Sequence, residues 1–330
     1  MEGEMIEMWA EAGPCGDSVD TALDYVRAVQ KSGATAIKVQ WYNVDTLVVP
    51  DASRYDNTGG LAENQYEMFE NSIYPYERWG PVIDLCKDLN VRFVPSVFDL
   101  EAVDVANDFQ LPTLKLASGD ITYHELLRAA SDGRQVAMST GAATLVEVEK
   151  AVDQLSQGEH ILMACHLEYP TPNHKANLAR TFELQLNFPH MIPGFSDHTP
   201  GIDTIPLIVA TGCQVIEKHF TLTPDQGYDS DFALSPVELR NAVLKIEGTT
   251  AVMGDTEIAP DAGERAARKG ARRSLYAAQD IPAGKHLDSD DIAILRPFYG
   301  IEPWEAPSYY GRSFGMDIPK GGEFPTAADY

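Results

Sequence analysis

The strongest constraint on the fold is an alternation, along the first 254 residues, of short apolar segments with longer segments of helical periodicity. The apolar segments, which we predict to be strands, are 5–11, 36–41, 91–98, 114–118, 135–140, 161–166, 191–196 and 215–220. The predicted helices are 18–31, 76–89, 100–108, 122–131, 144–156, 176–187, 201–210 and 236–252. Eight strand–helix units in about 250 residues are typical of an α/β protein of the (β/α)₈ TIM-barrel class.

The remainder of the chain is expected to form a second, smaller domain. Residues 255–270 are rich in Ala, Gly and charge and contain no strand pattern, so we predict a linker between a barrel at 1–254 and a domain at 271–330. An internal repeat marks this domain, DIPAGK at 280–285 and DIPKGG at 317–322. About 60 residues bury little apolar surface alone, so we expect docking on a barrel or a second subunit, and hence an oligomer.

Charge and composition exclude several classes of function. The formal net charge of the 330 residues is −25, which repels polyanions and argues against nucleic acid and anionic membranes as partners. With no basic leader and no apolar run near the ~18 residues of a membrane span, we expect a cytoplasmic protein. The four cysteines form no Cys-x-x-Cys motif, which argues against a zinc ribbon or disulfide framework. So acidic a chain also raises the hypothesis of solubility in high salt.

Polar side chains end the predicted strands, at the face where a barrel places its active site. His198 and His219 end neighbouring strands, with Asp197 and Glu217 beside them, and two neutral imidazoles so placed can share one divalent metal ion. Two histidines without cysteine leave coordination positions open, as in a catalytic site that polarises a carbonyl or holds water. The residues do not choose between Mn²⁺, Mg²⁺, Zn²⁺ and Fe²⁺. The alternative is a pair of hydrogen-bonded structural histidines.

Lys38 and Lys115 are predicted to lie inside strands, where a solvated lysine is out of place. Short hydroxyl side chains accompany them on the strand ends: Ser96, Ser118, Ser139 and Ser196. Lysines acting as point charges, with hydroxyl and loop N–H groups around them, predict a site for a small phosphorylated anion. The competing hypothesis is a Schiff-base aldolase that uses one of these lysines.

These residues lie in motifs that run nearly the length of the chain. The motifs are AEAG at 10–13, GATAIKVQ at 33–40, PSVFDLEAVD at 95–104, LKLASGDIT at 114–122, MSTGAATLVEV at 138–148, YPTP at 169–172, GFSDHTPGI at 194–202 and VIEKHFTL at 215–222. The chain resembles the sialic acid synthase family, whose members condense phosphoenolpyruvate with an N-acetylated aldose to give a nonulosonic acid. Its tail, RRSLYAAQDIPAG at 272–284, resembles the C-terminal antifreeze-like (SAF, β-clip) domain of that family.

The resemblance implies a role for each matching residue. His198 and His219 correspond to ligands of a divalent metal ion, Mn²⁺ with Mg²⁺ or Co²⁺ as alternatives. The residues implied for the phosphoenolpyruvate site are Lys38, Ser96, Lys115, Ser118, Ser139 and Ser196. Glu11 and Glu217 are implied as catalytic carboxylates, and the two histidines act with them. The residues implied for the sugar are Tyr169, Asp229 and Arg272, the last reaching across a domain-swapped homodimer.

Three departures from the family pattern concern sugar recognition. Residues 14–17 read PCGD where the family has Asn-His-Asn-Gly, Leu167 stands where some members carry a sugar-binding Asn, and Asp231 competes with Asp229 for one motif position. The sequence therefore leaves open N-acetylmannosamine as substrate, or a diacetamido-trideoxyhexose that leads to legionaminic or pseudaminic acid. The hypothesis from another class is a catalytically silent relative that binds a sugar.

Overall fold

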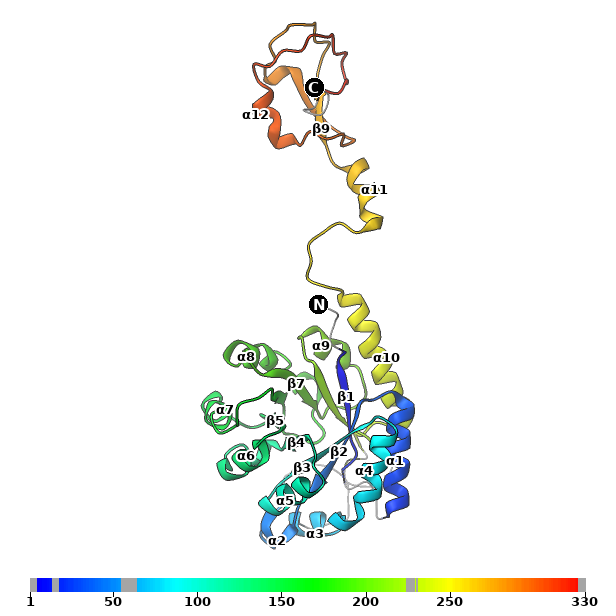
Figure 1. Cartoon of the computed structure of the whole chain (residues 1–330), viewed down its shortest axis with the longest axis vertical. Helices are drawn as coiled ribbons and strands as arrows, with labels where there is room; N and C mark the ends of the chain where they lie inside the picture. The colour runs from blue at the N-terminus through cyan, green and yellow to red at the C-terminus, as the bar shows by residue number, and fades with distance from the viewer. Residues whose placement is uncertain (1–4, 14–17, 55–63, 224–228, 230, 326–330) are drawn as a thin grey trace. The chain divides into compact units, whose positions relative to one another are not determined.

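Eight parallel strands close into a barrel, which confirms the predicted class (Figure 1). The computed structural model describes residues 5–13, 18–54, 64–223, 229 and 231–325. The strands are β1 (Glu7–Glu11), β2 (Ala36–Trp41), β3 (Arg92–Val97), β4 (Thr113–Leu116), β5 (Gln135–Ser139), β6 (Ile161–Cys165), β7 (Ile192–Asp197) and β8 (Val215–His219). Each predicted strand is present, and most are one or two residues shorter than predicted because pairing ends before the apolar run does.

Helices surround the barrel in the order that the periodicity predicts (Figure 1). The main ones are α1 (Val19–Ser32), α4 (Gly80–Asp88), α5 (Leu100–Asp108), α6 (His124–Ser131), α7 (Leu145–Val152), α8 (Arg180–Asn187), α9 (Ile205–Ala210) and α10 (Pro236–Met253). Two short helices, α2 (Val44–Leu47) and α3 (Gln65–Glu70), lie in the long connection after β2. None of the helices in the described part of the chain is long and apolar enough to cross a membrane.

Two apolar layers hold the barrel together. Inside it, Trp9, Val94 and Met163 are fully buried and pack with side chains from neighbouring strands. Outside it, the strands pack against helices, and α1 shows why the sequence folds there. Its buried face recurs at helical spacing, and the Ser18 hydroxyl accepts a hydrogen bond from Thr21 N at 3.1 Å at its first turn. The interior side chains form an apolar floor beneath the carboxyl ends of the strands.

Strand register places the chemically active residues side by side. Closure of the sheet pairs β1 with β8 and sets Glu11 opposite His219, while β1 and β2 set Glu11 opposite Lys38. Elsewhere Ser96 faces Lys115, and Ser196 faces Glu217. These residues are far apart in the sequence, and the barrel gathers them at one end.

Neighbouring residues of the same strands point to the opposite side and form a structural ion pair. Lys218 Nζ lies 2.9 Å from Asp197 Oδ2, and both side chains are fully buried. Thr204 Oγ1 and Thr199 N also donate to the Asp197 carboxylate. Burial opposes the charge on Asp197, but Lys218 and these hydrogen bonds outweigh burial and lower its pKa. Asp197 therefore belongs to the helix-facing layer and not to the predicted metal site.

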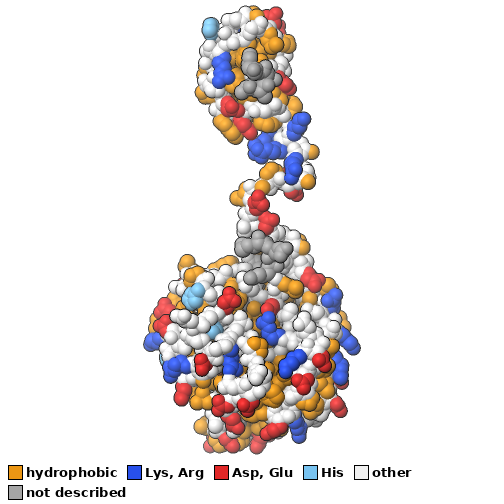
Figure 2. Space-filling view, in the orientation of Figure 1, with side chains coloured by type: hydrophobic (Ala, Val, Ile, Leu, Met, Phe, Trp, Pro, Cys, Tyr) orange, Lys and Arg blue, Asp and Glu red, His pale blue; other side chains and the backbone are white. Residues whose placement is uncertain are grey.

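The residues after Gly254 form a second compact unit, Asp255–Tyr330. The predicted linker is largely a helix, α11 (Ala262–Ala271), because Ala, Glu, Arg and Lys are good helix formers and Asp261 caps its first turn. Its side chains are exposed, and Figure 2 shows Lys and Arg gathered there. Strand β9 (Ser274–Ala277) pairs with β10 (Ile292–Leu295) in an antiparallel sheet, and a short helix, α12 (Ala306–Tyr309), follows.

The internal repeat of the second unit pairs with itself. Ile281 N donates to Ile318 O at 2.8 Å, and Ile318 N donates to Ile281 O at 2.9 Å. The two aspartates act reciprocally: Asp317 accepts from Ala283 N at 2.8 Å, and Asp280 accepts from Lys320 N at 2.9 Å. The two similar motifs therefore form a pseudo-symmetric clip around the apolar core of this unit.

Replacing Lys218 by Met should lower the free energy of unfolding by about 3 kcal/mol, because Asp197 would remain buried without its cation. Urea denaturation measures the change, and Lys245→Met, which removes a partly exposed partner of the exposed Asp203, is the control. The free energies of unfolding of wild type and Lys218→Met should approach each other as the pH falls below about 4. Protonation of Asp197 then removes the stabilisation that its lowered pKa gives the wild type. Equal stability of the two variants at neutral pH would contradict the assignment.

Asp280→Ala and Asp317→Ala should each weaken the clip by about 1 kcal/mol, because each leaves one backbone N–H without its acceptor. Hydrogen exchange of the Ile281 and Ile318 amides should then accelerate about fivefold in the intact chain. The exposed Asp255 provides the control variant, Asp255→Ala. Acceleration in only one of the two variants would contradict the reciprocal arrangement.

Candidate active site

The predicted site residues of the barrel unit converge at the carboxyl ends of its strands. Those on the strands and at their immediate ends are all buried: Glu11, Lys38, Ser96, Lys115, Ser118, Ser139, Ser196, His198, Glu217 and His219. Tyr169 and Asp229 reach the same place from the loops after β6 and β8. Arg272 lies in the second unit, where its guanidinium is 3.4 Å from Glu302.

A lysine between two carboxylates forms the centre of the site. Lys38 Nζ lies 2.7 Å from Glu11 Oε2 and 3.8 Å from Glu217 Oε1. Gln40 Nε2 and Gly13 N donate to the other oxygen of Glu11, at 2.9 and 3.1 Å. Burial opposes the charge of Lys38, but the two carboxylates outweigh burial and raise its pKa. Burial likewise opposes ionisation of Glu217, but Lys38 and Lys115 lower its pKa to about 2, so Glu217 is a carboxylate at neutral pH.

Hydroxyl groups surround the second lysine. Lys115 Nζ donates to Ser139 Oγ at 2.6 Å and to Leu116 O at 2.9 Å, and burial lowers its pKa. Ser118 Oγ accepts from Gly141 N at 3.0 Å. The Ser96 hydroxyl, opposite Lys115 in the sheet, is fully buried and has no hydrogen-bond partner among the described residues. A buried hydroxyl without a hydrogen-bond partner is unusual. This one lies opposite a lysine, and a hydroxyl beside a lysine can bind an anion.

The two histidines lie together, each oriented through one ring nitrogen. Their ring centroids are 5.3 Å apart. His198 Nδ1 lies 3.0 Å from His166 O and therefore carries the proton, while His219 Nδ1 lies 2.9 Å from Asp229 Oδ2. Burial, followed by the neighbouring His219, lowers the pKa of His198 to about 3, so this ring is neutral. A ligand would therefore bind at the Nε2 atoms, and that of His198 lies 3.5 Å from Ser196 Oγ.

This arrangement fits a metal ion, because metal-binding histidines commonly hold their second nitrogen on a carbonyl or a carboxylate. The buried oxygen Glu217 Oε2, which has no hydrogen-bond partner among the described residues, adds a hard donor nearby. In the described part of the chain no three His, Cys, Asp or Glu side chains group closely enough to hold an ion by themselves. Metal binding by His198 and His219 therefore stays a prediction.

Aromatic rings cover the histidines on the loop side. The Tyr169 ring lies 4.2 Å from that of His198, and the Phe232 ring lies 4.8 Å from that of His219, measured between centroids. Phe232 was not predicted, because it lies in a loop whose path the strand pattern does not indicate. The same loop brings Asp229 against His219, so Asp229 orients a ring in addition to any contact with a sugar.

Two side chains of the segment after β6, Glu168 and Leu167, have defined surroundings near the site. The Glu168 carboxylate lies 3.1 Å from His166 Nε2 and 3.0 Å from Lys175 Nζ, so it is held within this loop. A Cβ atom added at Gly141 would lie 3.0 Å from Leu167 Cβ, which places Leu167 beside the hydroxyl-rich part of the site. The departure at residues 14–17 lies outside the described residues.

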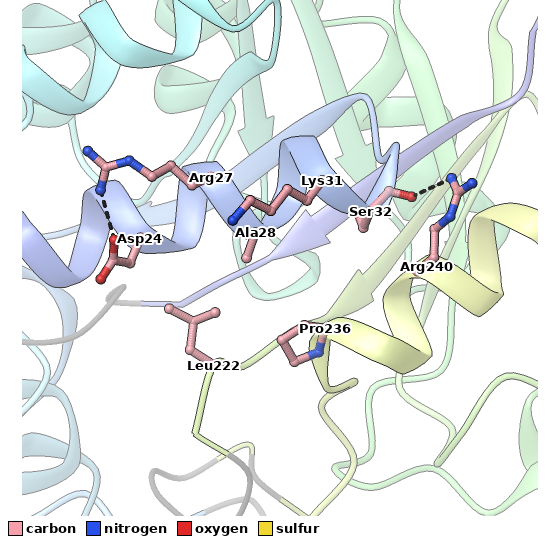
Figure 3. Close-up of a pocket in the computed structure, with 8 residues that line it drawn as sticks. All are labelled: Asp24, Arg27, Ala28, Lys31, Ser32, Leu222, Pro236 and Arg240. Atoms are coloured by element: carbon pink, nitrogen blue, oxygen red, sulfur yellow. Dashed lines mark hydrogen bonds and ion pairs between the residues drawn. The ribbon is translucent and has the colours of Figure 1, made fainter.

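A separate pocket of about 460 Å³ lies on the flank of the barrel, between α1 and α10 (Figure 3). It is lined by Asp24, Arg27, Ala28, Lys31, Ser32, Leu222, Pro236 and Arg240. Arg27 pairs with Asp24 at 2.8 Å, and Arg240 donates to Ser32 O at 3.1 Å, so both arginines already hold neighbouring groups. No predicted site residue lines this pocket.

Gly141→Ala should impair the hydroxyl-rich part of the site, because the added Cβ would lie 2.8 Å from Ser118 Oγ and 3.1 Å from Cys165 Sγ. We expect the affinity for a phosphorylated anion to fall about tenfold, as measured by calorimetry. Gly119→Ala is the matched control, since nothing lies within 4 Å of a Cβ added there. Equal affinities of the two variants would argue that Ser118 does not contact the anion.

Known proteins and family models match both units of the chain. The model of the NeuB family matches residues 25–258, and the model of the SAF domain matches residues 272–309. An N,N'-diacetyllegionaminic acid synthase from Legionella pneumophila is 32% identical, over 94% of this chain and 91% of its own. A pseudaminic acid synthase from Campylobacter jejuni is 29% identical, over 92% and 90%. The crystal structure of an N-acetylneuraminic acid synthetase from Leptospira borgpetersenii is 28% identical, with a TM-score of 0.73 over 80% of this chain and 90% of its own.

Proposed function

This chain belongs to the NeuB family, and we propose that it is a metal-dependent nonulosonic acid synthase that condenses phosphoenolpyruvate with an open-chain N-acetylated aldose and releases phosphate. The observation that carries the proposal is that one buried site combines side chains suited to an anion with side chains suited to a metal ion. Two lysines and several hydroxyls suit the phosphate, and two histidines that each hold Nδ1 on an oxygen suit a divalent ion, Mn²⁺ first. Relatives named for legionaminic and pseudaminic acid support diacetamido hexoses beside N-acetylmannosamine as substrates.

The reaction joins carbon 3 of phosphoenolpyruvate to the aldehyde carbon of the sugar. Water adds to carbon 2, and the C–O bond to phosphate breaks as phosphate leaves. A bound divalent ion would polarise the aldehyde as a Lewis acid. Lys38, Lys115 and the serines bind and orient the phosphate. Glu217, held ionised beside Lys38, would orient the water and take its proton, with Glu11 holding Lys38 in position.

Phosphate release from phosphoenolpyruvate with Mn²⁺ tests the function. The sugars to compare are N-acetylmannosamine, its 6-phosphate and the diacetamido-trideoxyhexoses that lead to legionaminic and pseudaminic acids, in low and high salt. We expect release with one of these sugars, abolished by EDTA and lowered more than about a hundredfold by His198→Ala. His190→Ala, at an exposed position, is the control.

Two other results would each favour a different function. Activity that is indifferent to EDTA, with borohydride trapping on Lys38 or Lys115, would favour a Schiff-base aldolase. Metal binding without phosphate release in the presence of any of these sugars would favour a catalytically silent sugar-binding relative.

Cross-linking and a mixed dimer of Arg272→Ala and His198→Ala chains would test the domain swap, because activity restored by mixing requires a site shared between subunits.

A further inference from the structure

The loop between β6 and α8 contacts His198 at two points, and one buried threonine belongs to both contacts. Thr171 lies in this loop and is 1% exposed. Its backbone N–H donates to His198 O at 2.9 Å, which fixes the loop to the main chain after β7. Nearer the start of the loop, His166 O accepts a hydrogen bond from His198 Nδ1 at 3.0 Å. The loop therefore holds both the backbone and the ring of His198.

The Thr171 hydroxyl connects the two contacts through the backbone of Glu168. Its Oγ1 donates to Glu168 O at 2.7 Å, and a longer contact of 3.3 Å reaches His166 O. A hydroxyl carries one hydrogen, so the shorter bond is the stronger of the two. Glu168 N in turn donates to His166 O at 3.0 Å. Thr171 therefore holds the residue whose N–H holds the carbonyl that accepts from the His198 ring.

The ion pair of the same loop is more exposed than this hydroxyl. Lys175 Nζ lies 3.0 Å from Glu168 Oε1, and the two side chains are 47% and 26% exposed. Exposed ion pairs contribute little, because water and salt screen them and both side chains lose conformational freedom. A buried carbonyl that loses its donor has no water to replace it. We therefore expect the Thr171 hydroxyl, and not the ion pair, to fix this part of the loop.

We propose that Thr171 is a positioning residue, which holds the His166 carbonyl against His198 and so aims Nε2 of that ring at the metal ion. A carbonyl on one imidazole nitrogen fixes both the tautomer and the orientation of the ring. The Tyr169 ring, 4.2 Å from that of His198, belongs to the same loop. The inference rests on the proposed function, because it takes a divalent ion as the ligand of Nε2.

Thr171→Val keeps the shape of the side chain and removes its hydroxyl. We expect the dissociation constant of Mn²⁺ to rise about tenfold, measured by calorimetry on the full chain without substrates, because groups that orient metal ligands affect metal affinity on this scale. Thr171→Ser keeps the hydroxyl and should bind Mn²⁺ as the wild type does. Thr211→Val is the matched control, since Thr211 is also buried and its hydroxyl donates to a backbone carbonyl, Ile208 O, at 2.7 Å. Lys175→Ala should also leave the affinity unchanged.

A second measurement needs no metal ion and separates the inference from the proposed function. Nitrogen-15 NMR of the metal-free protein reports which ring nitrogen of His198 carries the hydrogen. We expect the Nδ1–H tautomer in the wild type, in Thr171→Ser and in Thr211→Val. Its share should fall in Thr171→Val, because the carbonyl that selects this tautomer is then no longer fixed.

Thr171→Val with the Mn²⁺ affinity and the tautomer of the wild type would overturn the inference, even if the wild type is an active synthase. An equal loss of affinity in Thr211→Val or Lys175→Ala would overturn it too, because a general loosening of the barrel or the loop would then explain the effect. A wild type that binds no Mn²⁺ would overturn the metal-dependent function, and the tautomer comparison would then decide whether Thr171 positions the ring. Thermal unfolding checks that each variant folds, and Thr171→Ala, which also lacks the hydroxyl, carries the comparison if Thr171→Val does not.

Discussion

Compensation of buried charge is the constraint on which the site depends. Lys38, Glu11 and Glu217 are each at least nine-tenths buried, and burial of a charged group without a partner favours its neutral form. Barrel closure sets them on three adjacent strands, so that the lysine lies between the carboxylates. The carboxylates raise the pKa of Lys38, and Lys38 together with Lys115 lowers the pKa of Glu217, so these two groups stay charged. The Lys38 ammonium thus persists inside the barrel of a protein whose net charge is −25.

The same strands serve stability and chemistry on opposite sides. Ser196 and Glu217 point into the site, whereas their neighbours Asp197 and Lys218 pair with each other beneath the helices. A two-residue period separates the two roles because successive side chains of a strand face opposite ways. Two motifs that look equally functional in the sequence, SDHT and EKHF, are therefore partly structural.

Residues in the loops after β6 and β8 contact the two histidines at the strand ends. Asp229 and Phe232 reach His219 from the connection after β8, and His166 offers its carbonyl to His198 from the connection after β6. These contacts set which imidazole nitrogen faces a ligand. Leu167, one of the departures from the family pattern, also lies in a loop, the connection after β6.

The sequence alone determined the class of fold, the order of its elements and the candidate residues on the strands, because apolar periodicity and the polar residue that ends each strand are local properties. The motif resemblance also identified the family. Only the tertiary structure decided that Asp197 faces Lys218 and not a metal site, and that Asp229 holds His219. Those contacts arise between residues distant in the chain, and strand register and loop path, which no local pattern encodes, bring them together.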